Sequence, residues 1–420
     1  MAEPARIAAI TTTFFPNSHA GVLAAKFLTG FPTDEGLIPP RTRVVSLYID
    51  QIHRNDVGLQ LARQWGVPVY QSIPAALTLD TGELAVDGVL LIGEHGDYPR
   101  TALGQEMLPR RWLFEQVCGV LAEHGRPVPV FCDKHLSYRW SDARWMYDTA
   151  RELRVPLWAG SSLPVHWRRP NVEHPLGDPL DEALATGFHM LERYGFHALE
   201  SLQCQVERRA GGETGVVAVT CLSGRDVWRA ADAGRWPTDL ADAALAATNP
   251  GPDRLEPERV SDPHVFLIEY ADGLRGTVLM LGDDGYVRKF AYAGRRAGRV
   301  DAREFHGDEG PNHAHFSYFG LAVEDFLLSG RPQSPVERTL LTTGVLEAAL
   351  ISHHCGGRRI ETPHLGITYA PMTGAVRRPT GSEPSGASLE PVPMPEPGAT
   401  PAAEPIPVDR DGTIRSTPHD

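Results

Sequence analysis

The chain has 420 residues, of which 42% are hydrophobic, and this is enough for two domains with sizeable cores. Its formal net charge of −13 at pH 7 argues against a large nucleic-acid or anionic-membrane surface, because those partners select basic patches. No apolar run reaches membrane-spanning length, and the start, MAEPARIAAI, lacks the apolar region of a signal peptide. Five cysteines without a Cys-x-x-Cys pair favour a reducing cytoplasm over a disulfide framework.

The first 165 residues alternate between strand-like and helix-like segments. Continuous apolar runs, typical of parallel strands buried on both faces, lie at 6–15, 42–50, 67–70, 86–94, 128–134 and 155–162. Apolar residues at helical spacing occupy 16–28, 56–66, 109–125 and 142–154. Asn17 or Ser18 is a candidate N-cap, and Gly66 lies where a helix should end. The alternation predicts an α/β fold with a doubly wound, Rossmann-like parallel sheet.

The rest of the chain no longer alternates regularly between strands and helices. A long helical stretch is predicted over 181–208, followed by antiparallel strands over 215–224, 263–282 and 285–294, in which ADGLRG is a hairpin turn. Two amphipathic helices are predicted at 316–330 and 334–357. We therefore expect an α+β domain with a mostly antiparallel sheet over 166–370, after a nucleotide-binding domain over 1–165. The proline-rich tail, 371–420, is predicted to be disordered.

Polar side chains follow three strands of the predicted sheet, in the segments GEHGDYPR, CDKHLSYRW and AGSSLPVHWRRP. Ligands of open parallel sheets bind beyond the carboxyl ends of the strands, so these residues should share one edge. They are Glu94, His95, Asp97, Asp133, Lys134, His135 and His166. One such segment would be an ordinary solvated loop, but three together favour a functional site.

The order of these parts resembles the glucose–fructose oxidoreductase family, also called the Gfo/Idh/MocA family, over nearly all of residues 5–370. Members carry Glu-Lys-Pro after the fifth strand, and the matching triplet here is Asp133-Lys134-His135. Members also carry an Asp-x-x-x-His motif on a helix early in the second domain. The best match, RYGFHALE, places His197 on the family histidine and Arg193 where the aspartate is expected.

The resemblance implies an oxidoreductase that acts on CH–OH groups with Lys134 and His197 as the acid/base pair, and with Asp133 and His135 beside them. Removal of hydride from a secondary alcohol requires a base for the hydroxyl proton, and a histidine suits that task. A desolvated lysine can bind the oxygen while its own pKa falls. The alternatives are a surface lysine and a core histidine, and His189 in GFHML is a second match to the motif.

The resemblance also implies NAD, yet the loop after the first strand departs from the expected Gly-x-Gly-x-x-Gly turn. The chain has TTTFFPNSHAG, in which Phe14, Phe15 and Pro16 occupy the space of the pyrophosphate. Phosphate would instead be bound by side chains at the strand edge, and the candidates for cofactor binding are Thr11, Thr12, Thr13, Asn17, Ser18 and Glu94. Asp50 would accept from a ribose hydroxyl, although an ordinary cap is the alternative.

A second hypothesis places a divalent metal, zinc or manganese, at the same edge, because histidines and carboxylates are their ligands. The candidates are Glu94, His95, Asp97, Asp133 and His135. Their spacing matches no known ligand pattern, and a hydrogen-bonded loop is the alternative. Candidates for substrate binding are His95, Asp97, Tyr98, His166, Trp167 and Arg193, and Trp140 or Trp167 could stack on a sugar ring. His313 and His315 are more typical of a solvated loop.

Three functions remain open at this point. The first is hydride transfer between a nicotinamide cofactor and a small sugar-like or polyhydroxylated molecule. The second is a metal-assisted or cofactor-independent lyase, epimerase or hydrolase that uses the cluster of Glu94 to His135. The third is a non-catalytic binding protein. An exposed sheet face in the second domain, together with the resemblance, would favour a homodimer or homotetramer. No nucleic-acid or membrane partner is expected.

Overall fold

The structure is a computed structural model that describes residues 3–282, 285–308, 310–371, 377–385 and 390–397. The first sheet is fully parallel with the order β5-β4-β1-β6-β7-β8. Its strands are β1 (Ala5–Thr11), β4 (Thr42–Ile49), β5 (Val69–Tyr70), β6 (Gly88–Ile92), β7 (Val130–Asp133) and β8 (Leu157–Gly160). This order confirms the predicted doubly wound sheet, with the switch of direction between β1 and β6.

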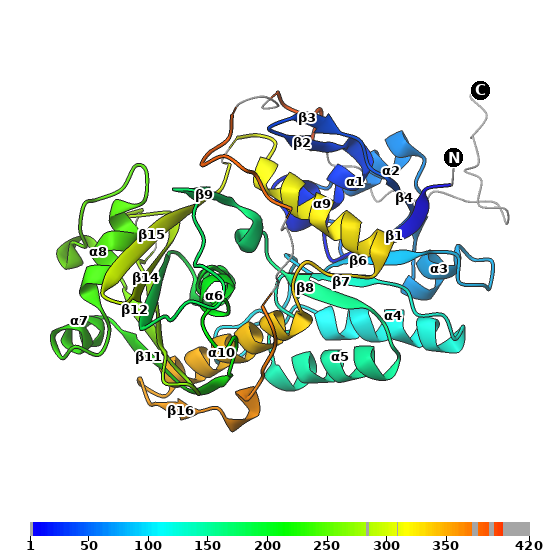
Figure 1. Cartoon of the computed structure of the whole chain (residues 1–420). Helices are drawn as coiled ribbons and strands as arrows, with labels where there is room; N and C mark the ends of the chain where they lie inside the picture. The colour runs from blue at the N-terminus through cyan, green and yellow to red at the C-terminus, as the bar shows by residue number, and fades with distance from the viewer. Residues whose placement is uncertain (1–2, 283–284, 309, 372–376, 386–389, 398–420) are drawn as a thin grey trace.

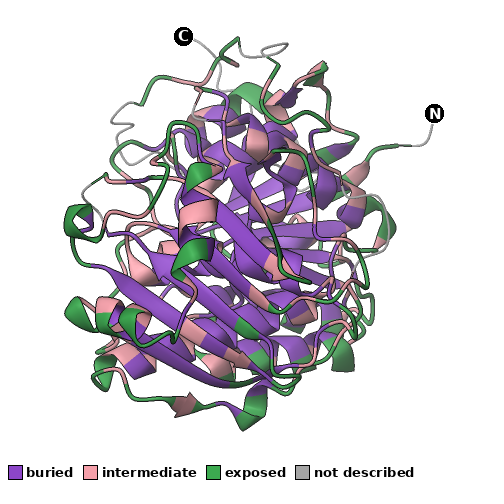
Figure 2. Ribbon diagram, turned by 60° about the vertical axis from the view of Figure 1, so that its left-hand side comes forward, coloured by how far each residue is buried: buried purple, intermediate pink, exposed green. Residues whose placement is uncertain are grey.

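Helices cover both faces of this sheet (Figure 1). One face packs on α3 (Ile73–Thr78), α4 (Arg110–Glu123) and α5 (Trp140–Glu152). The other packs on α2 (Gly58–Trp65) and on α9 (Ala314–Ser329), which returns from the far end of the sequence. Because apolar side chains are needed on both faces, β6 reads GVLLI and is buried throughout. Figure 2 shows that most strand residues are buried, whereas exposed residues lie mainly on surface helices and loops. Gly66 ends α2 in the left-handed conformation, φ 65°, as predicted.

The second sheet has eight strands in the order β16-β11-β12-β13-β10-β14-β15-β9. All its pairs are antiparallel except β10 with β13. Its strands are β9 (Trp167–Arg169), β10 (Glu182–Gly187), β11 (Val216–Ser223), β12 (His264–Tyr270), β13 (Arg275–Met280), β14 (Phe290–Arg296), β15 (Arg299–His306) and β16 (Ile360–Glu361). The β12–β13 pair is the predicted hairpin. A mostly antiparallel second sheet was also predicted, and it is confirmed.

Helices lie on both faces of the second sheet as well (Figure 1). The inner face carries α6 (Leu191–Val206) and α10 (Val336–His354). The outer face carries α7 (Arg225–Asp232) and α8 (Thr238–Ala246), and α8 contacts β10, β14 and β15. The exposed sheet face from which an oligomer was inferred is therefore covered over these strands, and the homo-oligomer stays a prediction.

Two local predictions were wrong. The stretch 181–208 is not one helix, because 182–187 form β10 between β13 and β14. Its Ala and Leu residues have high helix propensity, but pairing on both sides in the sheet overrides that preference. The helix expected at 16–28 is a π-helical turn, Ala20–Ala24, followed by the short α1 (Lys26–Thr29). The N-cap of this turn is His19 and not Asn17 or Ser18, although the Ser18 Oγ accepts from the Gly21 N–H at 3.1 Å.

A small hairpin, β2 (Phe31–Thr33) with β3 (Gly36–Ile38), lies beside α9. Of the tail predicted to be disordered, residues 377–385 and 390–397 are described and have no helix or strand. They contact the body of the protein, as in the Arg377–Asp325 ion pair at 2.6 Å. The rest of that tail, with 372–376 and 386–389, lies outside the described residues. Within the described ranges, no helix is both long enough and apolar enough to cross a bilayer.

Candidate active site

A buried triad of charges lies at the ends of β6 and β7. The Glu94 carboxylate follows β6 and forms ion pairs with Arg110, at the start of α4, and with the Nζ of Lys134 at 3.3 Å. All three side chains are at most 3% exposed. Burial, and then the charges of Arg110 and Arg193, lower the pKa of Lys134 to about 7. The triad therefore leaves a lysine that changes protonation state at neutral pH.

Lys134 is held by its backbone as well as by its ion pair. It has φ 67°, a left-handed conformation that few residues with a side chain adopt, and its N–H donates to the Gly160 carbonyl at 2.9 Å. This bond ties the end of β7 to the end of β8. Backbone strain of this kind is characteristic of functional sites, since the surrounding structure must stabilise it.

His197, on α6 of the second domain, is half-buried and lies near this triad. Its pKa lies well below its ordinary value, first because of burial and next because of the Lys134 charge. Phe290 and Tyr194 flank the imidazole with ring centroids at 5.8 and 6.0 Å. Lys134 and His197 thus lie close enough for their charges to interact, and their role as an acid/base pair stays a prediction. His189, the other match to the motif, contacts Tyr194 at 4.7 Å.

Asp133 is paired with a residue that sequence analysis missed. Its Oδ2 lies 2.5 Å from the Nδ1 of His19, in the loop after β1, and the carboxylate is fully buried. The His19 ring contacts His95 and Phe316, both at 5.5 Å. The predicted helix over 16–28 offered only Asn17 and Ser18, just before His19, as polar residues with a role. The proximity of His19 to the end of β7 cannot be predicted until the order of the strands in the sheet is known.

The remaining histidines of the edge also lie close together. The Nε2 of His135 is 3.4 Å from an Arg110 nitrogen, and that of His166 is 3.0 Å from the Ser162 hydroxyl. His166 and His315 have ring centroids 4.6 Å apart, so His315 belongs to the site and not to a solvated loop. Four of these rings have a buried Nδ1 that no described residue hydrogen-bonds: His135, His166, His197 and His315. Such nitrogens are available to water or to a bound molecule.

Asp50 lies at the end of β4, where an acidic residue was expected. Both of its carboxylate oxygens already accept hydrogen bonds, from the Tyr48 hydroxyl at 2.9 Å and from the Tyr98 hydroxyl at 2.6 Å. Burial, with the added effect of Asp50, raises the pKa of Tyr48 to about 12 and that of Tyr98 further, so both remain donors. The hydroxyl of Tyr98, a candidate for substrate binding, is therefore already bound to Asp50. The carboxylate keeps lone pairs for a further donor.

The threonines of the loop differ in what they can bind. Thr11 and Thr12 donate to the carbonyls of Tyr48, at 3.1 Å, and Glu94, at 2.7 Å. Of these three, Thr13 has a buried hydroxyl with no partner in the ranges that the structure describes. Asn17 is exposed and contacts His313 at 3.2 Å. Thr13 is thus the threonine hydroxyl of this loop that is available to a phosphate.

A hollow of about 490 Å³ lies beyond the ends of β1, β4 and β6. Phe14 does not block it, because the Phe14 ring is buried against Gly58 in the core. Phe15 lines one side and contacts His53 at 4.2 Å. Polar side chains of the lining include Thr13, Gln51, His53, Arg54, His95 and Arg193. Burial, and next the His19 charge, lower the pKa of His95 to about 2, so His95 is neutral.

Not every predicted substrate residue faces this region. Trp167 is fully buried and donates through Nε1 to Asp34 at 3.0 Å, beside the β2–β3 hairpin. Asp97 is exposed at the rim of the hollow, and Arg193 forms an ion pair with Glu106.

The metal hypothesis is not supported by the geometry. Among the described residues, no three His, Cys, Asp or Glu side chains converge as a metal ion requires. Glu94 is neutralised by Lys134 and Arg110, and Asp133 is paired with His19, so the carboxylates proposed as ligands already have partners.

Comparisons with known proteins agree with this architecture. The sequence matches no protein-family profile and no curated protein sequence. Among solved structures, the chain is similar to GenD2 of gentamicin A biosynthesis, in complex with NAD, at 18% identity and a TM-score of 0.54, covering 86% of this chain and 97% of that one. It is also similar to myo-inositol 2-dehydrogenase from Lactobacillus plantarum, at 11% identity and 0.51, covering 85% and 99%. A third is scyllo-inositol dehydrogenase from Lactobacillus casei, at 9% and 0.53, covering 86% and 99%.

These likenesses extend over both domains and are structural, since the identities are low. The chain therefore has the two-domain fold of the family that its sequence resembles, and the fold prediction is confirmed. Which residues act is decided by the site itself.

Proposed function

We propose that the protein is an oxidoreductase that transfers a hydride between a nicotinamide dinucleotide and a secondary alcohol of a small sugar-like molecule. The observation that carries this proposal is the buried Lys134, paired with Glu94 at the carboxyl edge of the parallel sheet and close to His197. The NAD complex and the inositol dehydrogenases among the similar structures support the same chemistry.

Lys134 is the proposed acid/base group. A catalytic base works best when its pKa is near the operating pH, and the pKa of Lys134 is about 7. In the direction of alcohol oxidation, its neutral amine accepts the hydroxyl proton. His197 has a pKa well below its ordinary value, so it is a weaker base and serves as a neutral hydrogen-bonding partner of the substrate oxygen.

Arg110 and Glu94 position Lys134 and supply the charges that surround it. Glu94 contacts the amine directly, whereas Arg110 contacts Glu94 and the ring of His135. When Lys134 accepts a proton, the Glu94 carboxylate stabilises the ammonium that forms. The Asp133 carboxylate orients the His19 ring by accepting a hydrogen bond from its Nδ1–H.

The strand-end hollow, which lies beyond the ends of β1, β4 and β6, fits the polar half of a dinucleotide, but with different phosphate-binding groups from those of a glycine-rich turn. The buried Thr13 hydroxyl without a partner and the cations Arg54 and Arg193 would contact phosphate in place of a glycine-rich turn. Asp50 would accept a ribose hydroxyl beside Tyr98. The bound dinucleotide supplies the hydride acceptor or donor.

His166 and His315 are proposed to line the substrate end, together with the predicted His95. Their pKa values are all lowered, first by burial, so they present neutral rings. Neutral imidazoles donate and accept hydrogen bonds without attracting a counter-ion, and this suits the hydroxyls of an uncharged polyol. Trp167 is left out of this set because of its contact with Asp34.

The test is an activity screen with NAD⁺ and NADP⁺ against inositols, hexoses and nucleotide sugars, followed by absorbance at 340 nm. Oxidation should rise with pH through about 7, because Lys134 must be neutral to accept the proton. Lys134→Arg keeps a cation but cannot act as a base at this pH, and it should abolish turnover together with Lys134→Met. Equal turnover in Lys134→Met and wild type would refute the assignment.

A further inference from the structure

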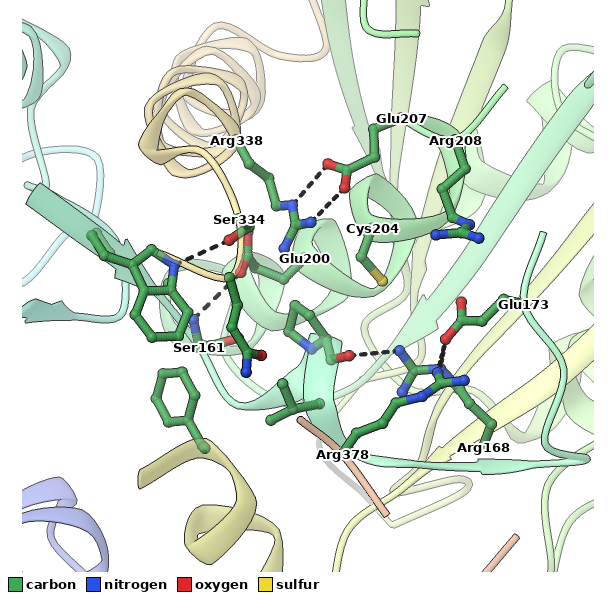
Figure 3. A pocket seen from close by; sticks show the side chains of 17 residues that line it. Ser161, Arg168, Glu173, Glu200, Cys204, Glu207, Arg208, Ser334, Arg338 and Arg378 are labelled. Atoms are coloured by element: carbon green, nitrogen blue, oxygen red, sulfur yellow. Dashed lines mark hydrogen bonds and ion pairs between the residues drawn. The ribbon is translucent and has the colours of Figure 1, made fainter. Parts of the chain in front are cut away.

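A second cavity, of about 200 Å³, lies between β8, α6 and α10, outside the region of Lys134 (Figure 3). Its lining contains four arginines, Arg168, Arg208, Arg338 and Arg378, and three glutamates, Glu173, Glu200 and Glu207. Cys204, Gln333 and two serines, Ser161 and Ser334, also line it. The proposed function uses none of these groups.

Two of the glutamates are fully engaged with arginines. Arg338 binds Glu207 through two nitrogens, one of them at 2.8 Å, and both side chains are buried. Glu173 accepts from Arg168 at 3.1 Å and also pairs with Arg378, which belongs to the C-terminal stretch 377–385. These pairs leave one arginine, Arg208, and one glutamate, Glu200.

Arg208 has no carboxylate partner among the described residues. Its Nε donates to the His174 carbonyl at 2.6 Å, and its terminal nitrogens extend into the cavity (Figure 3). Arg208 is half-buried, and Arg168 and Arg378 share the single carboxylate of Glu173, so arginines outnumber carboxylates at this end of the cavity. The lining therefore has unsatisfied positive charge on the side of Arg208, Arg168 and Arg378.

The opposite end of the cavity offers neutral hydrogen-bonding groups. Ser161 is 4% exposed, and its hydroxyl has no partner among the described residues. Glu200 accepts from the Ser161 N–H at 3.4 Å, and burial raises its pKa to about 7. The Thr342 hydroxyl and the Arg338 and Glu207 charges also face Glu200. Glu200 is thus protonated in a large fraction of molecules at neutral pH.

We propose that this cavity binds a small phosphorylated or carboxylated metabolite, with its anionic group at Arg208 and its hydroxyl end at Ser161. The site is distinct from the strand-end hollow, and its occupancy does not depend on the proposed hydride transfer. Proton uptake by Glu200 accompanies binding, because an incoming anion disfavours an ionised carboxylate in the same cavity. Affinity for the anion therefore falls as pH rises through about 7.

The experiment is calorimetric titration of the full chain, free of nucleotide, with two probes. Sulfate keeps its charge across the pH range and tests the arginine end, whereas glycerol 3-phosphate tests the whole cavity. Arg208→Gln should weaken both probes about tenfold or more, because a charged hydrogen bond is lost. Arg229→Gln, which removes an exposed surface arginine, is the matched control and should match wild type.

Ser161→Ala gives a result that misfolding cannot imitate. Within the described part of the chain its hydroxyl has no partner, so the variant should unfold at the wild-type temperature or above. It should weaken glycerol 3-phosphate about threefold to tenfold and leave sulfate unchanged, since one neutral hydrogen bond is removed at one end only. Glu200→Gln should remove the pH dependence of sulfate binding between pH 6 and 8.

Two results would overturn the proposal. One is sulfate binding that Arg208→Gln leaves at wild-type strength. The other is sulfate binding that is lost in Arg54→Gln but not in Arg208→Gln, since this would place the anion in the strand-end hollow. Neither result bears on whether the protein oxidises alcohols, which the absorbance assay decides separately.

Discussion

The two ends of the strand-edge crevice differ in how tightly their polar groups are paired. Around Lys134 the charges are buried and matched, with Glu94 between Lys134 and Arg110. In the strand-end hollow, by contrast, Asp97 is exposed and the Thr13 hydroxyl is unpartnered. Proton transfer needs charges fixed in a dry environment, whereas phosphate can be bound by many combinations of donors. A chain of this fold can therefore replace the glycine-rich turn with other phosphate donors more easily than it can replace the buried lysine.

Arg110→Met should have the largest effect, because it removes one partner of a buried ion pair. Loss of Arg110 leaves Glu94 with Lys134 alone and should lower the free energy of unfolding by about 3 kcal/mol. Urea unfolding measures this. Arg229→Met, whose exposed side chain is paired with Asp226 on the surface, is the control and should cost below about 1 kcal/mol. Equal costs at the two positions would show that the triad contributes nothing.

Lys134 should also make stability depend on pH. Its pKa is about 7 when folded and near 10.5 when unfolded, so the unfolded chain binds more protons between these values. The free energy of unfolding should therefore rise by about 1.4 kcal/mol per pH unit at most, from about pH 7 upward. Lys134→Met should remove this rise between pH 7 and 8.5. A slope that persists in Lys134→Met would assign it to another group.

His19→Ala should have a smaller effect on stability than Arg110→Met. It leaves the buried carboxylate of Asp133 without its partner, at a cost of about 1–3 kcal/mol. His19→Gln keeps a side-chain amide donor and should recover part of the loss. Thermal unfolding of the two variants makes the comparison, and identical unfolding temperatures for all three proteins would count against the Asp133–His19 pair.

Tyr98→Phe tests the nucleotide end and should have the smallest effect. It removes the hydroxyl that occupies one Asp50 oxygen, so a ribose hydroxyl gains an acceptor. NADH affinity should rise about twofold to fivefold. A weaker affinity would mean that the Tyr98 hydroxyl itself contacts the nucleotide.

The doubly wound parallel sheet and the gathering of polar residues at its strand ends could be predicted from the sequence, but the order of the strands could not. Continuous apolar runs identify buried strands, and the topology of such sheets then places Glu94 and Lys134 together. The partners could not be predicted, because Arg110 and His19 reach the cluster from a helix and a loop with no local pattern. The strand β10 was missed because its small residues favour a helix in isolation.

The arginine-lined cavity could not be predicted from the sequence at all. Arg168, Arg208 and Arg338 lie on separate elements, and each has an unremarkable position in the sequence. Only packing of α6 against α10 and β8 brings their charges into one space. A sequence pattern cannot report such a cluster, since nothing in the spacing relates the three positions.

The most direct test is a titration of the purified protein with NADH, followed by nucleotide fluorescence and by energy transfer from tryptophan. We expect saturable binding at a single site, weakened at least tenfold in Arg54→Gln and little changed in Arg208→Gln. An absence of saturable NADH binding at millimolar nucleotide, in a protein that is folded by circular dichroism, would contradict the proposed hydride transfer.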